Sequence, residues 1–148
     1  MSKDAAVTRD LIQTLEDGKD GFAKGADKLQ GDEAMQIATT FRELSARRGE
    51  LSGELQVLAK NHGEAADESG TVAAALHRGW MSLKDVVAGS DPKGVLDVAE
   101  QGEDHAIKEY EKALEADISP ELRTVVERQL VDVQRAHDQV KALRDAHA

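Results

Sequence analysis

The sequence predicts an all-helical protein folded as a bundle of long helices. Its 148 residues include only two prolines and four aromatic side chains. Strong helix formers such as Ala, Leu, Glu, Lys and Gln are frequent. Apolar residues recur every three or four positions, which is the spacing of one helix face. A chain of this length is expected to form one domain, residues 1–148, with enough apolar side chains for a core.

The first 87 residues contain three predicted helical segments. The first two run from about Asp4 to Leu29 and from about Asp32 to His62, with the helix-terminating residue Gly31 between them. Residues 63–70 show no periodicity and are expected to form a loop. A shorter third helix is predicted from Thr71 to Val87, because apolar residues recur there on one face.

The last two helices begin at prolines. The segments Ser90–Pro92 and Ser119–Glu121 are typical helix starts, since each places a proline in the first turn. The fourth helix is therefore expected from Pro92 to about Ala116, and the fifth from Pro120 nearly to the end of the chain.

The lengths of the connections predict how these helices are arranged. Short turns join the first helix to the second and the fourth to the fifth, so each pair should form an antiparallel hairpin. At about 1.5 Å per residue, the third helix can carry the chain about 25 Å, most of the height of a bundle. The fold is then a ferritin-like four-helix bundle with a long crossover containing a fifth, shorter helix. In the alternative arrangement, the third helix folds over one end.

Two charged residues interrupt the predicted core at one height. Glu103 lies in the stripe Leu96, Ala99, Glu103, Ala106 and Tyr110. Arg48 lies in the stripe Ile37, Phe41, Leu44, Arg48, Leu51, Leu55 and Leu58. If the hairpin turns lie at opposite ends, both residues fall near mid-height, because Arg48 is about seventeen residues from its turn and Glu103 about fourteen from its own.

An ion pair between Arg48 and Glu103 is the preferred interpretation. An ionised carboxylate in a core needs a cation, and a guanidinium binds carboxylates through two hydrogen bonds. Tyr110, Gln129 and Thr14 are candidates for the remaining hydrogen bonds, and His137 lies at the edge of its helix's core face. The predicted buried polar core consists of Arg48, Glu103, Tyr110, Gln129 and His137. In a second interpretation, Arg48 extends outward to solvent.

Glu103 is alternatively a metal ligand. Ferritin-like di-iron sites use a Glu from each of two helices and a Glu-x-x-His from each of the other two. None of the five histidines has an acidic residue three positions before it, and Glu16, Asp17 and Asp20 are expected to point away from the core. Only Glu103 and His137 remain as metal candidates. We therefore predict no cofactor, with iron or another divalent metal as the alternative.

Several glycines lie in the interiors of the predicted helices. Each is expected to destabilise its helix by about 1 kcal/mol relative to alanine. They share one side of the first helix and the outer side of the second: Gly18, Gly21, Gly25, Gly49 and Gly53. Either the crossover packs closely against them, with Trp80 as its anchor, or they form the interface of a homodimer.

Composition excludes several classes of function. The chain has no cysteine, which rules out disulfides, thiolate metal sites and cysteine catalysis. A formal net charge of -10 argues against nucleic acid or an anionic membrane as a partner. No apolar stretch approaches the roughly 20 residues of a membrane span, and the N-terminal residues do not form a signal peptide, so a cytoplasmic protein is expected. Phosphate-binding loops, a nucleophile elbow and paired core carboxylates are also missing, which favours a non-catalytic protein.

Several short motifs together resemble a known family. They are Asp17–Phe22, Leu76–Trp80, Gly102–Asp104 with Tyr110, Glu127–Gln129 and Ala136–Asp138. These residues look like a bacterial family of four-helix-bundle proteins of unknown function in the ferritin-like superfamily, and the resemblance extends from about Leu11 to Leu143. It implies a ferritin-like bundle in a bacterial cell, with a role in stress or storage physiology, but it supplies no reaction.

Overall fold

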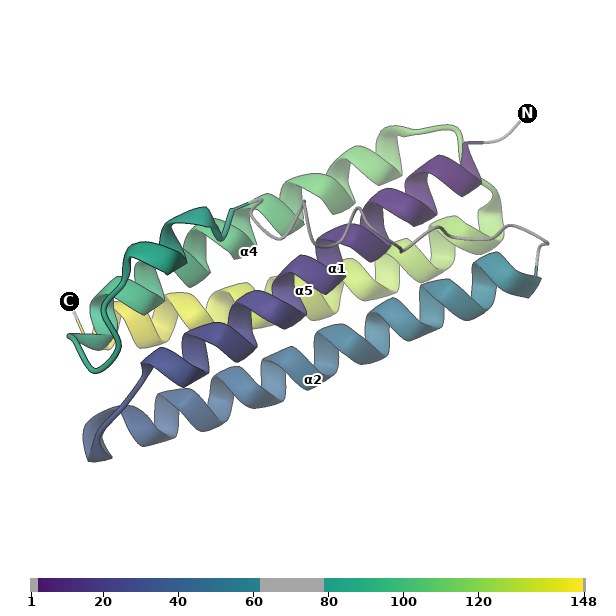
Figure 1. The fold of residues 1–148 in the computed structure, drawn as a ribbon. Coiled ribbons are helices and arrows are strands. Elements are labelled where there is room, and N and C mark those ends of the chain that lie inside the picture. Colours follow the sequence, from purple (N-terminus) through teal and green to yellow (C-terminus); the bar gives the residue numbers. More distant parts are fainter. Residues whose placement is uncertain (1–2, 62–78, 148) are drawn as a thin grey trace.

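Four long helices packed side by side form the protein. The computed structural model describes residues 3–61 and 79–147. Within these residues there is no β-strand, and the helices form a bundle, as the composition predicts (Figure 1). The elements are α1 (Asp4–Lys28), α2 (Asp32–Asn61), the short 3-10 helix η1 (Met81–Asp85), α4 (Pro92–Glu115) and α5 (Pro120–Ala146).

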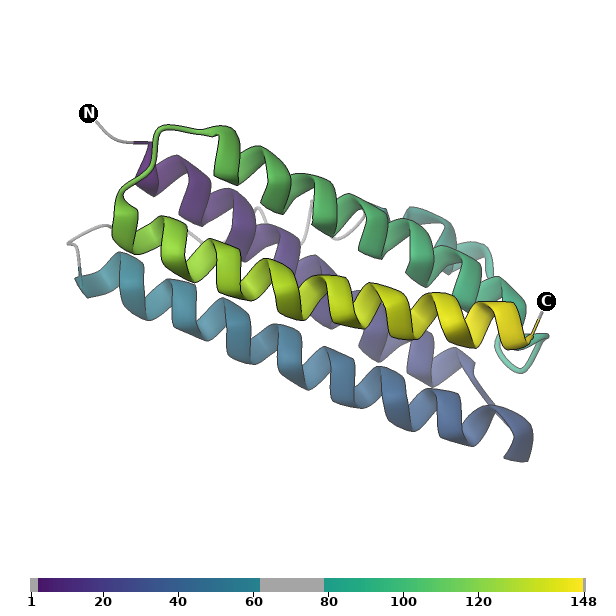
Figure 2. The same ribbon diagram turned by 180° about the vertical axis from the view of Figure 1, so that it is seen from behind.

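The two hairpin turns lie at opposite ends of the bundle. In Figure 1 the α1–α2 turn lies at the end that also holds the C-terminus, and the α4–α5 turn lies at the end that holds the N-terminus. Figure 2 shows the same arrangement from behind. Helices α2 and α4 therefore run in the same direction. The end of α2 and the start of α4 lie at opposite ends of the bundle, which is the arrangement that the predicted crossover connection requires.

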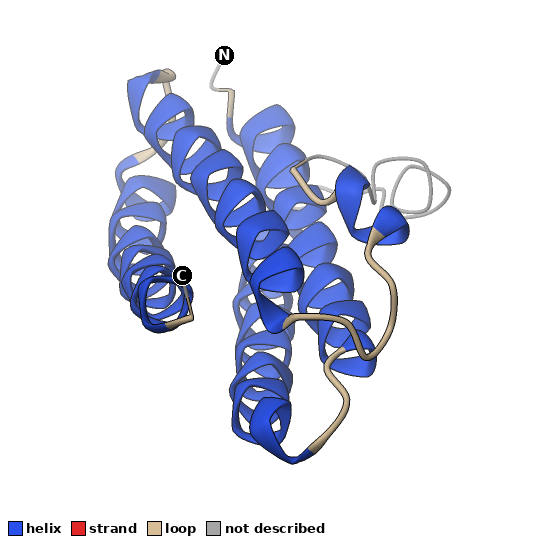
Figure 3. Ribbon diagram, turned by 90° about the vertical axis from the view of Figure 1, so that its left-hand side faces the viewer, coloured by secondary structure: helices blue, strands red, loops and turns tan. Residues whose placement is uncertain are grey.

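The predicted third helix is wrong in the part of the chain that the structure describes. Gly79 and Trp80 form a turn, and the following residues form η1 rather than an α-helix. Gly79 has a φ of 77°, a left-handed conformation that interrupts a right-handed helix. Figure 3 shows η1 outside the four long helices, and it contacts α1 and α4. The remainder of this predicted helix, residues 71–78, and the predicted loop at 63–70 lie outside the described residues.

The ends of the long helices agree closely with the sequence analysis. In α4, the Asp91 carboxylate accepts a hydrogen bond from the backbone N–H of Lys93 at 2.9 Å. In α5, the Ser119 hydroxyl oxygen accepts one from Leu122 N–H at 3.2 Å. Ser119 Oγ also donates to Asp4 Oδ2 at 2.6 Å, which ties the start of α1 to the α4–α5 turn. These caps satisfy N–H groups that have no partner within the helix.

The core consists of two apolar clusters, one toward each end of the bundle. The cluster toward the α1–α2 turn includes Phe22, Phe41, Trp80 and Leu96, and the other includes Leu15, Leu55, Tyr110 and Val126. On α2 and α4 the two clusters are separated at Arg48 and Glu103. The charged residues therefore lie at an internal boundary between apolar layers. No helix of the described residues is both long and apolar enough to cross a membrane.

Candidate functional site

Arg48 and Glu103 form an ion pair inside the bundle. Arg48 Nη2 donates a hydrogen bond to Glu103 Oε2 at 2.5 Å, and the two residues are only 1% and 0% exposed. Helix α1 packs against α2 and α4, and α5 packs against α4 and α2, so α2 and α4 occupy diagonal corners. The pair therefore spans the interior of the bundle rather than one seam between adjacent helices.

Helix α1 makes room for the guanidinium. The Arg48 Cζ atom lies 5.4 Å from the centre of the Phe22 ring, within the range of a cation–π contact. A Cβ atom placed on Gly18 would lie 2.9 Å from Arg48 Nη1, so any larger residue would press on the guanidinium. Gly18 is thus explained by internal packing against the ion pair.

The carboxylate of Glu103 is satisfied on one oxygen only. Oε1 is buried and has no hydrogen-bond partner among the described residues. Burial raises the pKa of Glu103, and the charge and hydrogen bond of Arg48 oppose that rise. The two-bond fork expected for this pair is therefore absent. Thr14, one of the expected additional donors to Glu103, is also engaged elsewhere, because its Oγ1 donates to the Asp10 carbonyl oxygen.

Tyr110 and Gln129 belong to a separate hydrogen-bond network. Tyr110 Oη donates to Gln129 Oε1 at 2.8 Å. Gln129 Nε2 donates to the Leu51 carbonyl oxygen at 3.1 Å and to Glu54 Oε1 at 2.8 Å, and Arg128 donates to Glu54 Oε2. Burial also raises the pKa of Tyr110, which keeps its hydroxyl protonated as a donor. Two of the predicted polar core residues, Tyr110 and Gln129, thus belong to a series of hydrogen bonds that connects the core with the surface between α2 and α5.

His137 lies at the edge of the core rather than inside it. Its side chain is 18% exposed, and Nε2 lies 2.7 Å from Asp104 Oδ1 at the surface. Its inclusion in the buried polar core is therefore wrong. The reason is its position about 60° from the centre of the core face of α5, where a side chain can reach the rim of α4. Within residues 3–61 and 79–147, no group of three or more His, Asp or Glu side chains is placed to hold a metal ion.

Asp17 is buried, with an exposed fraction of only 1%. From the sequence its side chain was predicted to point away from the core. However, Asp17 lies one turn before Gly21, and the Gly21 side of α1 is covered by Trp80. Helix α1 is therefore buried on two sides, not one. The glycines on that side of α1 were the available signal, because they indicate close approach of another segment.

The Glu54–Arg128 pair gives a pH-dependent prediction. The hydrogen bond from Arg128 lowers the pKa of Glu54 below its ordinary value, so the pair stabilises the fold at neutral pH. This contribution is expected to disappear as the pH falls through the lowered pKa of Glu54. Since both side chains are partly exposed, Glu54→Gln should lower the free energy of unfolding by no more than about 1 kcal/mol at pH 7. Urea titrations at several pH values measure this difference.

Glu43→Gln is the matched control for Glu54→Gln. Glu43 lies on the same helix, is exposed, and forms no ion pair within the described residues. Its effect should be smaller than that of Glu54→Gln at neutral pH. A destabilisation by Glu54→Gln that persists unchanged into strong acid would contradict the assigned role of Arg128.

Fold and site together define an all-helical four-helix bundle whose two core apolar layers are separated by an ion pair. Residues 5–116 match a family model described as a domain of unknown function, DUF2383, and the chain belongs to this family. The match includes α1, α2, η1 and α4, and therefore both Arg48 and Glu103. Helix α5, which carries Gln129 and His137, lies beyond it. A comparison with proteins of curated function finds no match.

Proposed function

We propose that this chain is a ferritin-like bundle of the bacterial cytoplasm with a structural or interactive role rather than a catalytic one. The observation that carries the proposal is the contact between Arg48 Nη2 and Glu103 Oε2 at 2.5 Å, inside the bundle and between its two apolar layers. Ferritin-like di-iron proteins hold their metal ions in the core between facing helices. In this protein a guanidinium takes the corresponding role of neutralising the carboxylate.

Electrostatics supports this interpretation over metal binding. A divalent cation that bound Glu103 would lie next to a permanently charged guanidinium in a low-dielectric interior, where like charges repel strongly. It would also need several further oxygen or nitrogen ligands. The other candidate ligand from the sequence, His137, contacts Asp104 at the rim. The ion pair is therefore expected to hold the relative positions of α2 and α4.

Metal analysis tests the proposal. Protein purified without chelator should carry far less than one equivalent of iron, manganese or zinc, as measured by mass spectrometry of the elements. Adding ferrous iron should produce no protein-dependent oxidation. The metal-binding alternative predicts a stoichiometric ion that is lost in Glu103→Gln but retained in Glu111→Gln, a substitution at an exposed position of the same helix. That result would overturn the proposal.

A homodimer is a second proposal, and the glycines of α2 favour it. Among the described residues, a Cβ atom on Gly53 would contact nothing within 4 Å, and one on Gly49 would contact only the flexible side chain of Lys19. Internal packing thus explains Gly18, as described above, but does not explain these two. A second copy of the chain packed closely against this side of α2 would account for them, since glycine permits close approach of another backbone.

Light scattering distinguishes a homodimer from a monomer. If the α2 glycines form a dimer interface, the double variant Gly49→Leu with Gly53→Leu should be monomeric and folded, whereas the unsubstituted protein should be dimeric. No unfolding is expected, because the side chain added at position 53 meets none of the described residues and the one added at position 49 meets only the flexible side chain of Lys19. An unsubstituted protein that is monomeric across the accessible concentration range would contradict the dimer.

A further inference from the structure

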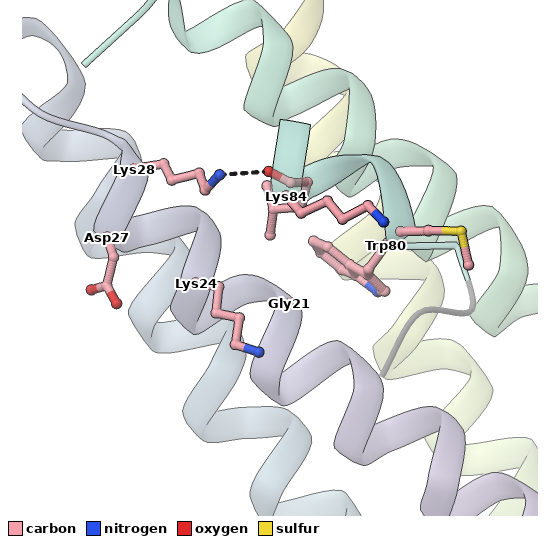
Figure 4. A pocket seen from close by; sticks show the side chains of 8 residues that line it. Gly21, Lys24, Asp27, Lys28, Trp80 and Lys84 are labelled. Carbon is pink, nitrogen blue, oxygen red and sulfur yellow. Dashed lines mark hydrogen bonds between the residues drawn. The ribbon is translucent and has the colours of Figure 1, made fainter. Parts of the chain in front are cut away.

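A pocket of about 290 Å³ opens between α1 and η1, away from the ion pair (Figure 4). Its wall combines an apolar surface with several charged side chains from two segments that are far apart in the sequence. The lining residues are Gly21, Lys24, Asp27, Lys28, Trp80, Met81, Leu83 and Lys84. Its volume is at the lower end of the range for small-molecule sites, which suits a ligand smaller than a typical cofactor.

The apolar part of the pocket is tightly packed. Trp80 is wedged between two helices, because added Cβ atoms on Gly21 and Gly102 would lie only 2.3 Å and 2.2 Å from its indole atoms. Its ring also packs edge-on against Phe22, with 4.9 Å between ring centres. Leu83 is buried beside it. A preformed apolar wall of this kind binds hydrocarbon without a large cost of ordering the protein.

The charged part of the pocket is positive. Lys24 on α1 and Lys84 in η1 have no carboxylate partner within the described residues. Lys28 is committed to the structure, because its Nζ donates to the carbonyl oxygens of Leu83 at 2.7 Å and Val86 at 2.5 Å. It therefore holds η1 against α1.

The single acidic side chain of the lining does not cancel this charge. In Figure 4 Asp27 points away from Trp80, and it pairs with Arg42 at 3.4 Å. A chain with a formal net charge of -10 thus presents two ammonium groups at the mouth of an apolar pocket that are unpaired within residues 3–61 and 79–147. The charge complementarity favours an anion, and the wall favours an apolar body.

We propose that this pocket binds a small amphipathic carboxylate of the medium-chain fatty acid class. The hydrocarbon would pack against Trp80 and Leu83, and the carboxylate would lie between Lys24 and Lys84. A neutral ligand would leave both ammonium groups without partners, and a larger anion would exceed the volume of the pocket. This binding site is independent of the Arg48–Glu103 pair and of any role in metal chemistry.

Trp80 provides the measurement, because it is the only tryptophan in the chain. Titration of the full-length protein with decanoate, below its micelle concentration, should give a saturable change in tryptophan emission. Decanol should bind at least about tenfold more weakly. It lacks the carboxylate, and the ion pairs of that carboxylate with the two exposed lysines should contribute roughly this factor to the affinity. Raising the salt concentration should weaken decanoate binding and leave decanol binding unchanged.

The double variant Lys24→Gln with Lys84→Gln should lose most of the preference for decanoate over decanol. Both positions are exposed and their side chains make no hydrogen bond or ion pair within the described residues, so the fold should be retained, as checked by thermal melting. Lys108→Gln, at an exposed lysine of α4 outside the pocket, is the matched control and should bind decanoate normally.

Several results would overturn the proposal. One is the absence of a saturable emission change with decanoate. Another is equal affinity for decanoate and decanol, or a preference that survives the double lysine variant. A third is an emission change that follows protein concentration together with a doubling of mass in light scattering, which would identify a second acidic copy of this chain as the occupant.

Discussion

Glu103→Ala is expected to lower the free energy of unfolding by about 3–5 kcal/mol, because it leaves the guanidinium of Arg48 buried without a counter-charge. Arg48 is 1% exposed and lies against the ring of Phe22, so it cannot reach water without rearranging the bundle. Within the described residues, its charge is neutralised by the single hydrogen bond to Glu103. Urea denaturation followed by circular dichroism measures the loss.

A double variant separates the ion pair from the packing around it. Arg48→Met with Glu103→Leu removes both charges while keeping similar side-chain volumes, and should be much more stable than Glu103→Ala, since apolar replacement of a buried pair is often neutral or stabilising. Glu111→Ala, at an exposed position of α4, is the control and should change stability little. A loss below about 1 kcal/mol for Glu103→Ala, typical of exposed pairs, would show that this ion pair does not hold the core.

Gly102→Ala is expected to lower the free energy of unfolding by about 1–3 kcal/mol, although alanine by itself favours a helix. The added Cβ atom would lie 2.2 Å from one indole atom of Trp80, and Gly21 confines the ring on the opposite side. The indole must therefore move out of its place against Phe22. Tryptophan emission, which arises from this residue alone, should shift toward that of an exposed indole in parallel with the loss of stability.

Gly53→Ala is the matched control and should have the opposite sign. Within a single copy of the chain its Cβ atom would contact none of the described residues within 4 Å, so for unfolding of the monomer only the gain in helix propensity remains, about 1 kcal/mol at most. Both substitutions add one methyl group to a helix interior. Equal changes in the free energy of unfolding at positions 102 and 53 would show that the packing of the indole does not require glycine at position 102.

The long helices could be predicted because their signals are local. Proline and serine at the starts of α4 and α5, glycine after α1, and apolar spacing along each stripe depend only on neighbours in the chain. The prediction of a third helix was wrong in its described part because it also used only local signals. Its apolar spacing is compatible with a helix, but Gly79 adopts a left-handed conformation next to α4, where its own Cβ would lie 2.8 Å from the Cα atom of Gly102.

The heights of Arg48 and Glu103 also followed from the sequence, because helical rise and the positions of the turns determine them. The hydrogen bonds at that level did not follow. Whether Tyr110 reaches Glu103 or Gln129 depends on rotamers and on the rotation of α5, and in the structure it donates to Gln129. A difference of a few tens of degrees about a helix axis decides such contacts, and sequence periodicity does not resolve it.

The sequence by itself determined the helices, their hairpin pairing and the two charged interruptions of the core, because each depends on spacing along one helix or on a short turn. The tertiary structure decided which surfaces face a second neighbour. Trp80 covers the Gly21 side of α1, and the pocket at Lys24 and Lys84 exists because η1 packs there. Both features arise from contacts between segments more than fifty residues apart, and no periodicity within a single helix encodes such contacts.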